Sequence, residues 1–119
     1  MNEFINPPSA PAPAGPYSTA VRTGNGFLFL SGQISPGPGM VSGQTEKILS
    51  NIDKIIKECS FSVKDIIKIT VFLTDMGKFA EMNEAYSKFF DGHKPARTAV
   101  EVKSLPKGAL VEIEAVCCR

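Results

Sequence analysis

The pattern of apolar and polar positions predicts a β-hairpin near the start of the chain. Two apolar runs, Tyr17–Thr23 and Phe27–Gln33, flank Gly24-Asn25-Gly26, and Asn-Gly between such runs is a strong hairpin signal. Phe27 to Leu30 is apolar on both faces, whereas a strand with one wet face alternates. Only two helices are expected in this chain, so we expect a partner subunit to cover the second face.

Two stretches have a helical period. The first follows the Pro/Gly-rich loop Ile34–Met40, with Ser42 as its expected N-cap. Its apolar residues are Ile48, Leu49, Ile52, Ile55, Ile56 and Cys59. The second is capped by Asp75 and ends at Asp91-Gly92. Its buried stripe consists of Phe79, Met82, Asn83, Tyr86, Phe89 and Phe90. Both stretches are typical of amphipathic helices.

The remaining apolar runs predict three more strands. Val63–Thr74 is rich in β-branched residues, which favours a central strand. Arg97–Val102 follows Pro95, and Leu110–Cys118 follows a turn at 105–108. We expect strands 97–102 and 110–118 to pair as a hairpin, with their valine and isoleucine side chains toward the helices. The order of elements predicts one α+β domain over residues 1–119, with both helices on one face of a mixed sheet.

Charged side chains on the last two strands are the main candidates for chemistry. Alternation puts Arg97, Ala99 and Glu101 on one side of their strand, and Glu112 and Glu114 on one side of theirs. In the expected hairpin these charges share the face away from the helices. Two interpretations stay open: a solvated salt-bridge ladder that adds little stability, or a site where Arg97 binds a planar carboxylate.

Three further polar residues are candidates for a binding site. Tyr17 follows the rigid Gly15-Pro16, Ser31 ends an apolar strand beside Gly32, and Asn83 lies inside an apolar helical stripe. Each also has a plainer structural interpretation. These are packing for Tyr17, strand termination for Ser31 and a hydrogen bond to the backbone for Asn83.

Composition excludes several classes of protein. The formal net charge is +1, from 13 basic and 12 acidic residues, which gives no electrostatic reason to bind nucleic acid or an anionic membrane. There is no apolar run of about 18 residues, and Met1–Ile5 does not resemble a signal peptide. One histidine, His93, forms no evident metal site or Ser–His pair. The three cysteines, two of them adjacent, favour reduced thiols. We expect a cytoplasmic protein without a metal.

Segments along nearly the whole chain resemble, in order, the Rid (reactive intermediate deaminase) family. Each segment is short, and the resemblance comes from all of them together. They are 14–18 (AGPYS), 30–33 (LSGQ), 51–52 (NI), 71–76 (VFLTDM), 82–86 (MNEAY), 89–90 (FF), 95–97 (PAR) and 105–115 (LPKGALVEIEA).

The resemblance implies a fold, an assembly and an activity. The fold is chorismate-mutase-like, and the sheets of a homotrimer form a central barrel with the helices outside. Ligand clefts lie between neighbouring subunits. The implied activity is hydrolysis of 2-imino or enamine acids, such as 2-aminoacrylate and 2-iminobutanoate, to 2-keto acids and ammonia, with no cofactor.

The resemblance also assigns roles by position. Arg97 matches the arginine that holds the substrate carboxylate, and Glu112 matches the glutamate that positions the attacking water. Tyr17, Ser31 and Asn83 match other cleft residues. Ala99 stands where archetypal members carry a cysteine, so a backbone contribution at this position is kept and a thiol contribution is lost.

Two other functions remain as alternatives. The same trimer can serve as a non-catalytic binder of small ligands, although the presence of both Arg97 and Glu112 favours an enzyme. An endoribonuclease is the third interpretation, because that activity is ascribed to some relatives. The near-zero net charge and the lack of a histidine pair weigh against it.

Overall fold

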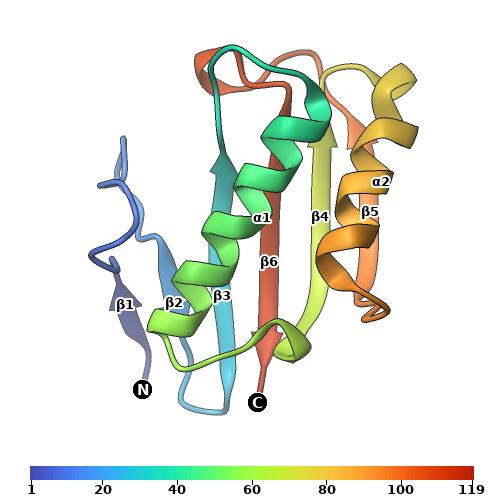
Figure 1. Ribbon diagram of the computed structural model, residues 1–119. Helices are drawn as coiled ribbons and strands as arrows, with labels where there is room; N and C mark the ends of the chain where they lie inside the picture. The colour runs from blue at the N-terminus through green and yellow to red at the C-terminus, as the bar shows by residue number, and fades with distance from the viewer.

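Two helices lie side by side on one face of a six-stranded sheet in the computed structural model, which describes residues 1–119 (Figure 1). The helices are α1 (Val41–Glu58) and α2 (Phe79–Phe90). The strands are β1 (Glu3–Ile5), β2 (Ala20–Arg22), β3 (Phe27–Ile34), β4 (Ile66–Leu73), β5 (Ala96–Glu101) and β6 (Val111–Cys118), in the order β1-β2-β3-β6-β4-β5. This arrangement confirms the α+β class and the position of both helices. The barrel of a homotrimer stays a prediction.

The hairpin expected near the start of the chain is confirmed between β2 and β3. These strands pair antiparallel, and the turn closes with a 2.9 Å hydrogen bond from the Thr23 amide to the Phe27 carbonyl. Gly26 has a φ of +98° in this turn, which a glycine adopts without strain. The first strand is shorter than expected, so Tyr17 lies in the preceding loop. Strand β1 was not predicted, because three residues carry too little pattern.

Both amphipathic helices form, with caps that differ in detail from the expected ones. Helix α1 begins after Met40, so Ser42 lies in its first turn and is not the cap. The Ser42 amide instead donates to the Glu81 carboxylate of α2 at 3.1 Å. Asp75 caps a short 3-10 turn, Met76–Lys78, that precedes α2, and its Oδ1 accepts from the Gly77 amide at 2.8 Å.

The hairpin expected between β5 and β6 is wrong. Strand β6 lies between β3 and β4 and pairs antiparallel with both, whereas β5 pairs parallel with β4 at the edge of the sheet. Helix α2 connects β4 to β5 (Figure 1). A helical crossover of this kind returns the chain parallel to the strand it left.

The faces of β5 are therefore the reverse of those expected. Arg97 aligns with Ile69 and Ala99 with Val71, two β4 residues that are fully buried beneath the helices. Paired residues point to the same face, so Arg97 and Ala99 face the helices. Val100 points to the opposite face and is 38% exposed. The salt-bridge ladder is also wrong, because Glu112 does not share the Arg97 face.

The sheet face away from the helices, called here the open face, keeps large apolar side chains at the surface. Leu28 and Leu30 of β3 are buried under the helices, while Phe29 between them is 46% exposed. A cover supplied from outside this chain would bury it, in line with the expectation from the apolar run. Neither helix has the length and apolarity that a membrane crossing demands. Cys59, Cys117 and Cys118 are free thiols.

Candidate active site

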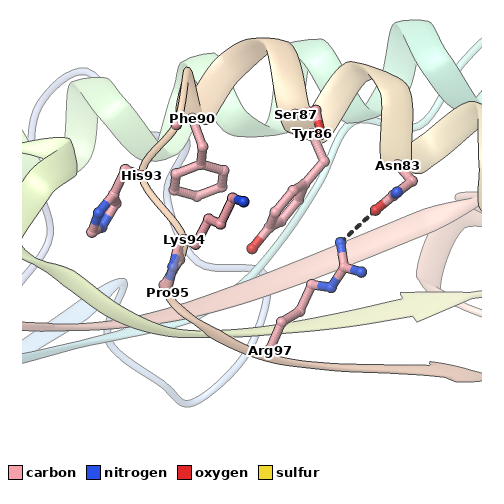
Figure 2. Close-up of a pocket in the computed structure, with 9 residues that line it drawn as sticks. Asn83, Tyr86, Ser87, Phe90, His93, Lys94, Pro95 and Arg97 are labelled. Carbon is pink, nitrogen blue, oxygen red and sulfur yellow. Dashed lines mark hydrogen bonds between the residues drawn. The ribbon is translucent and has the colours of Figure 1, made fainter.

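Arg97 lies beneath α2, where that helix fixes its guanidinium. Its Nη1 donates to Asn83 Oδ1 at 2.7 Å (Figure 2). Its Cζ lies 4.7 Å from the Tyr86 ring centroid and 5.5 Å from that of Phe79. A planar guanidinium gains from aromatic faces and an amide acceptor together, which a lysine ammonium does not match. These contacts explain how a charged side chain sits on the helix side of the sheet.

A pocket of about 390 Å³ opens beside this arginine. We call it the α2 pocket; its wall includes Asn83, Tyr86, Lys94 and Arg97. Arg97 donates one hydrogen bond of standard geometry to the protein, through Nη1 to Asn83 Oδ1. The remaining N–H groups of the guanidinium are free to donate to a carboxylate, which accepts two parallel bonds from arginine.

Tyr86 contributes a hydroxyl to the same pocket. The residue is only 8% exposed, and its hydroxyl is buried without a hydrogen-bond partner. The ring points from α2 into the space between Arg97 and Lys94 (Figure 2). Burial raises the pKa of Tyr86 while the Arg97 charge opposes the rise, so the group stays protonated at neutral pH. An unsatisfied buried donor is costly in a native structure, and a ligand oxygen here would satisfy it.

Glu112 lies in a second pocket of about 600 Å³ on the open face. We call it the open-face pocket; its wall includes Tyr17, Ser31, Gly32 and Glu112. Burial raises the pKa of Glu112, and the nearby charge of Glu114 raises it further. A carboxylate with a raised pKa binds a proton more readily than an ordinary one, as a general base requires.

Ser31 lines this pocket, but its hydroxyl already has a partner. The Oγ donates to the Ser18 carbonyl at 2.7 Å, and the Ser31 amide donates to the Thr19 carbonyl at 2.9 Å. Tyr17, by contrast, is half exposed in the loop before β2. Of the two side chains, Tyr17 therefore has the freer hydroxyl.

One chain does not bring the expected site residues together. Arg97, Ala99 and Asn83 gather on the helix side, while Glu112, Tyr17 and Ser31 line the open-face pocket. Arg97 aligns through Ile69 with Ala115, three residues from Glu112 and two strands away. Strand spacing and rise put their Cα atoms about 14 Å apart, with side chains on opposite faces. The candidate site exists as two halves.

Comparison with known proteins identifies the family. Residues 7–118 match the family model described as Endoribonuclease L-PSP. This chain belongs to that family, which includes the Rid proteins. A RutC family protein of Pyrococcus horikoshii, PH0854, is 48% identical over 123 residues that cover 98% of this chain and 97% of the relative. The resemblance to the Rid family is confirmed.

Solved structures of relatives have the same fold. Escherichia coli TdcF, crystallised with bound serine, is 40% identical with a TM-score of 0.91 over 98% of each chain. YyfA of Yersinia pestis, described as a member of the conserved Rid protein family, is 36% identical with a TM-score of 0.93 over 100% of each chain.

In this Rid-family chain, Ala99 lies on the Arg97 side of β5, partly buried against the core. It places a small apolar group next to the arginine. His93 is engaged in the fold, with Nε2 2.8 Å from the Ile66 carbonyl. No three His, Cys, Asp or Glu side chains are grouped to hold a metal ion.

Sequence reasoning missed the unpartnered hydroxyl of Tyr86 and the group that approaches Gly32. A tyrosine inside an apolar helical stripe has the pattern of a core residue, and nothing in the sequence marks its hydroxyl as unpartnered. The expectation that Ser31 ends its strand is wrong, because β3 continues to Ile34. A glycine next to Ser31 indicates a close approach without identifying the approaching group.

Proposed function

We propose that this protein hydrolyses reactive 2-imino and enamine acids, such as 2-aminoacrylate and 2-iminobutanoate, to 2-keto acids and ammonia in the cytoplasm. The observation that carries the proposal is the position of the Arg97 guanidinium. Asn83 and the Tyr86 ring of α2 fix its orientation, and its other N–H groups are free to bind a carboxylate. Membership of the Rid family supports it. The related TdcF binds serine, which has a carboxylate on the carbon that bears nitrogen, as these imines do.

The carboxylate of the substrate pairs with Arg97. Two parallel hydrogen bonds to the guanidinium fix the plane of the carboxylate and therefore the orientation of the adjacent C=N carbon. Asn83 and the Tyr86 ring keep the guanidinium in place. The Tyr86 hydroxyl donates a further hydrogen bond to the same carboxylate.

Glu112 supplies the base. It takes a proton from a water molecule as the water oxygen bonds to the electrophilic carbon and the C=N π electrons move to nitrogen. It then returns the proton to that nitrogen. Glu112 next moves the proton of the new hydroxyl to the same nitrogen, and the C–N bond breaks as its electron pair leaves with ammonia. The products are the keto acid and ammonia. An enamine such as 2-aminoacrylate enters the same sequence after protonation at carbon.

We further propose that three copies form a ring, so that the α2 pocket of one copy meets the open-face pocket of the next. The two halves lie on opposite faces of one chain, which makes a composite cleft the simplest way to join them. Head-to-tail contacts form a ring when the rotation that relates neighbouring copies closes. The exposed Phe29 and Val100 on the open face provide apolar area for such an interface.

Ribonuclease activity is a second candidate, favoured by the description of the family model. The net charge of +1 gives little long-range attraction for a polyanion. In the α2 pocket only two cationic side chains, Lys94 and Arg97, are placed to contact phosphate. RNA cleavage that survives the Arg97→Ala substitution and declines with further purification would identify a contaminant.

The test generates 2-iminobutanoate in situ with threonine dehydratase and measures 2-ketobutanoate release above the uncatalysed rate. Wild-type protein should accelerate release. Arg97→Ala should lower kcat/KM by about 10- to 100-fold, because charge-assisted hydrogen bonds contribute roughly 1.5–3 kcal/mol. Lys88→Ala is the control, since Lys88 makes only an exposed pair with Glu84. Wild-type rates in Arg97→Ala would rule out this assignment, and ligand binding without acceleration would favour the non-catalytic binder.

A further inference from the structure

Strand β3 contains a β-bulge beside Glu112. Its pairing with β6 runs to Leu30 opposite Ala115 and resumes with Gln33 opposite Ile113. Ser31 and Gly32 therefore lie across from one β6 residue, Glu114. Two residues against one define a bulge, a feature that re-aims side chains and is common next to active sites.

Three hydrogen bonds hold the bulge in shape. The Ser31 amide donates to the Thr19 carbonyl at 2.9 Å, and the Ser31 hydroxyl donates to the Ser18 carbonyl at 2.7 Å. The Gln33 amide nitrogen Nε2 donates to the Ser31 carbonyl at 3.0 Å. The bulge is thus tied to the segment before β2.

The carboxylate of Glu112 occupies the space that a side chain at position 32 would need. A Cβ on Gly32 would lie 2.2 Å from Glu112 Oε2, 2.8 Å from Cδ and 3.1 Å from Cγ. Gly32 is not among the glycines with positive φ. Its backbone conformation therefore suits any residue, and only the space beside Glu112 requires glycine.

We propose that Gly32 is a positioning residue, and that the bulge Ser31-Gly32 forms a recess that holds the Glu112 carboxylate in the orientation needed to activate water. The inference rests on the proposed role of Glu112 as the base. It also changes the role of Ser31, whose hydroxyl anchors the recess and does not contact substrate.

Other polar groups around the carboxylate come from three elements. Glu114 lies on the same strand, Lys107 comes from the turn before β6, and the Tyr17 hydroxyl comes from the loop before β2; all three line the open-face pocket. Burial is the largest cause of the raised pKa of Glu112. A carboxylate pushed out of the recess gains solvent, so its pKa falls toward the ordinary value.

The test compares Gly32→Ala with Gly43→Ala, a control in α1 where an added Cβ meets nothing within 4 Å. We expect Gly32→Ala to lower kcat/KM at least tenfold and to lower the pKa of Glu112 in a ¹³C NMR carboxyl titration. Gly43→Ala should change neither. An unchanged Glu112 titration in Gly32→Ala would overturn the proposal. The titration needs no substrate. It therefore tests whether the recess holds the Glu112 carboxylate even if wild-type protein proves inactive and the proposed function fails.

A double variant covers the case in which Gly32→Ala does not fold. Glu112→Ala empties the space beside position 32, so Gly32→Ala should cost little thermal stability in that background. A fold lost in Gly32→Ala and recovered in the double variant supports the recess. A double variant that is destabilised as much as the single one contradicts it, because the backbone would then be what requires glycine.

Discussion

Arg97 and Glu112 lie on opposite faces of one sheet, with β4 between their strands. A small imino acid has its carboxylate and its electrophilic carbon one bond apart, so it cannot reach both side chains within one chain. The proposed composite cleft between copies would remove the difficulty, because the next copy would bring its own Glu112.

Tyr86→Phe should show whether the Tyr86 hydroxyl contributes to ligand binding or to the stability of the fold. The substitution keeps the ring beside Arg97 and removes a buried hydroxyl that has no partner. We expect KM for the imine to rise about fivefold, and the free energy of unfolding to stay equal or rise by about 1 kcal/mol. Steady-state kinetics and urea denaturation measure the two effects.

Tyr86→Leu is the matched comparison. It removes the aromatic face from Arg97 as well, so kcat/KM should fall further than in Tyr86→Phe. Unchanged kinetics in Tyr86→Phe, combined with lower stability, would show that the hydroxyl serves the fold and not the ligand.

The pH dependence of activity should follow the ionisation of the Glu112 carboxyl group. Its pKa is raised by burial and by Glu114, and the proposed base would act in its ionised form. Activity should therefore decline on acidification at a higher pH than an ordinary glutamate would give, about 4.3. Glu114→Gln removes one raising charge and should move this decline to lower pH. A pH profile that Glu114→Gln does not alter contradicts the assignment.

The raised pKa of Glu112 also makes the stability of the protein depend on pH. A carboxyl whose pKa is raised in the native state favours folding most at low pH, and that contribution is lost as pH rises through the native pKa. Glu112→Gln should therefore raise the thermal midpoint at neutral pH relative to wild type, with the difference shrinking in acid. Thermal melts at several pH values measure this.

Phe29→Glu should dissociate the assembly. Phe29 is 46% exposed on the open face of each chain, so a charge there spares the core and disrupts an interface. We expect the mass measured by light scattering to change from trimer to monomer, with loss of deaminase activity and retention of helical signal. Met40→Glu, a change of an exposed residue in the loop before α1, should leave the trimer intact. A monomeric wild type would contradict the prediction at once.

Local patterns in the sequence predicted the local elements well. The hairpin at Asn25-Gly26 and the apolar stripes of both helices depend on neighbours within a few residues, and the structure has them. The pairing of β5 depends on the crossover through α2 and on the insertion of β6. Such long-range contacts leave no period in the sequence.

The candidate site also depends on long-range contacts that the sequence pattern does not show. The alternation of side chains along the strand correctly placed Arg97 and Ala99 on the same face of β5. It does not tell which of the two faces packs against the core. The side was misassigned because the contacts of the guanidinium with Tyr86 and Asn83 exist only once α2 packs over β5. The resemblance named the site residues, and the sequence could not show that they lie in two halves.

The most direct test of the composite cleft mixes two inactive variants. Arg97→Ala and Glu112→Gln are unfolded together in equal amounts, refolded, and assayed for 2-ketobutanoate release beside refolded wild type and each variant alone. In random mixed trimers, about a quarter of the clefts combine an intact Arg97 from one copy with an intact Glu112 from the next. We therefore predict recovery of about a quarter of the wild-type rate. Mixed trimers that stay as inactive as the separate variants would contradict the composite cleft.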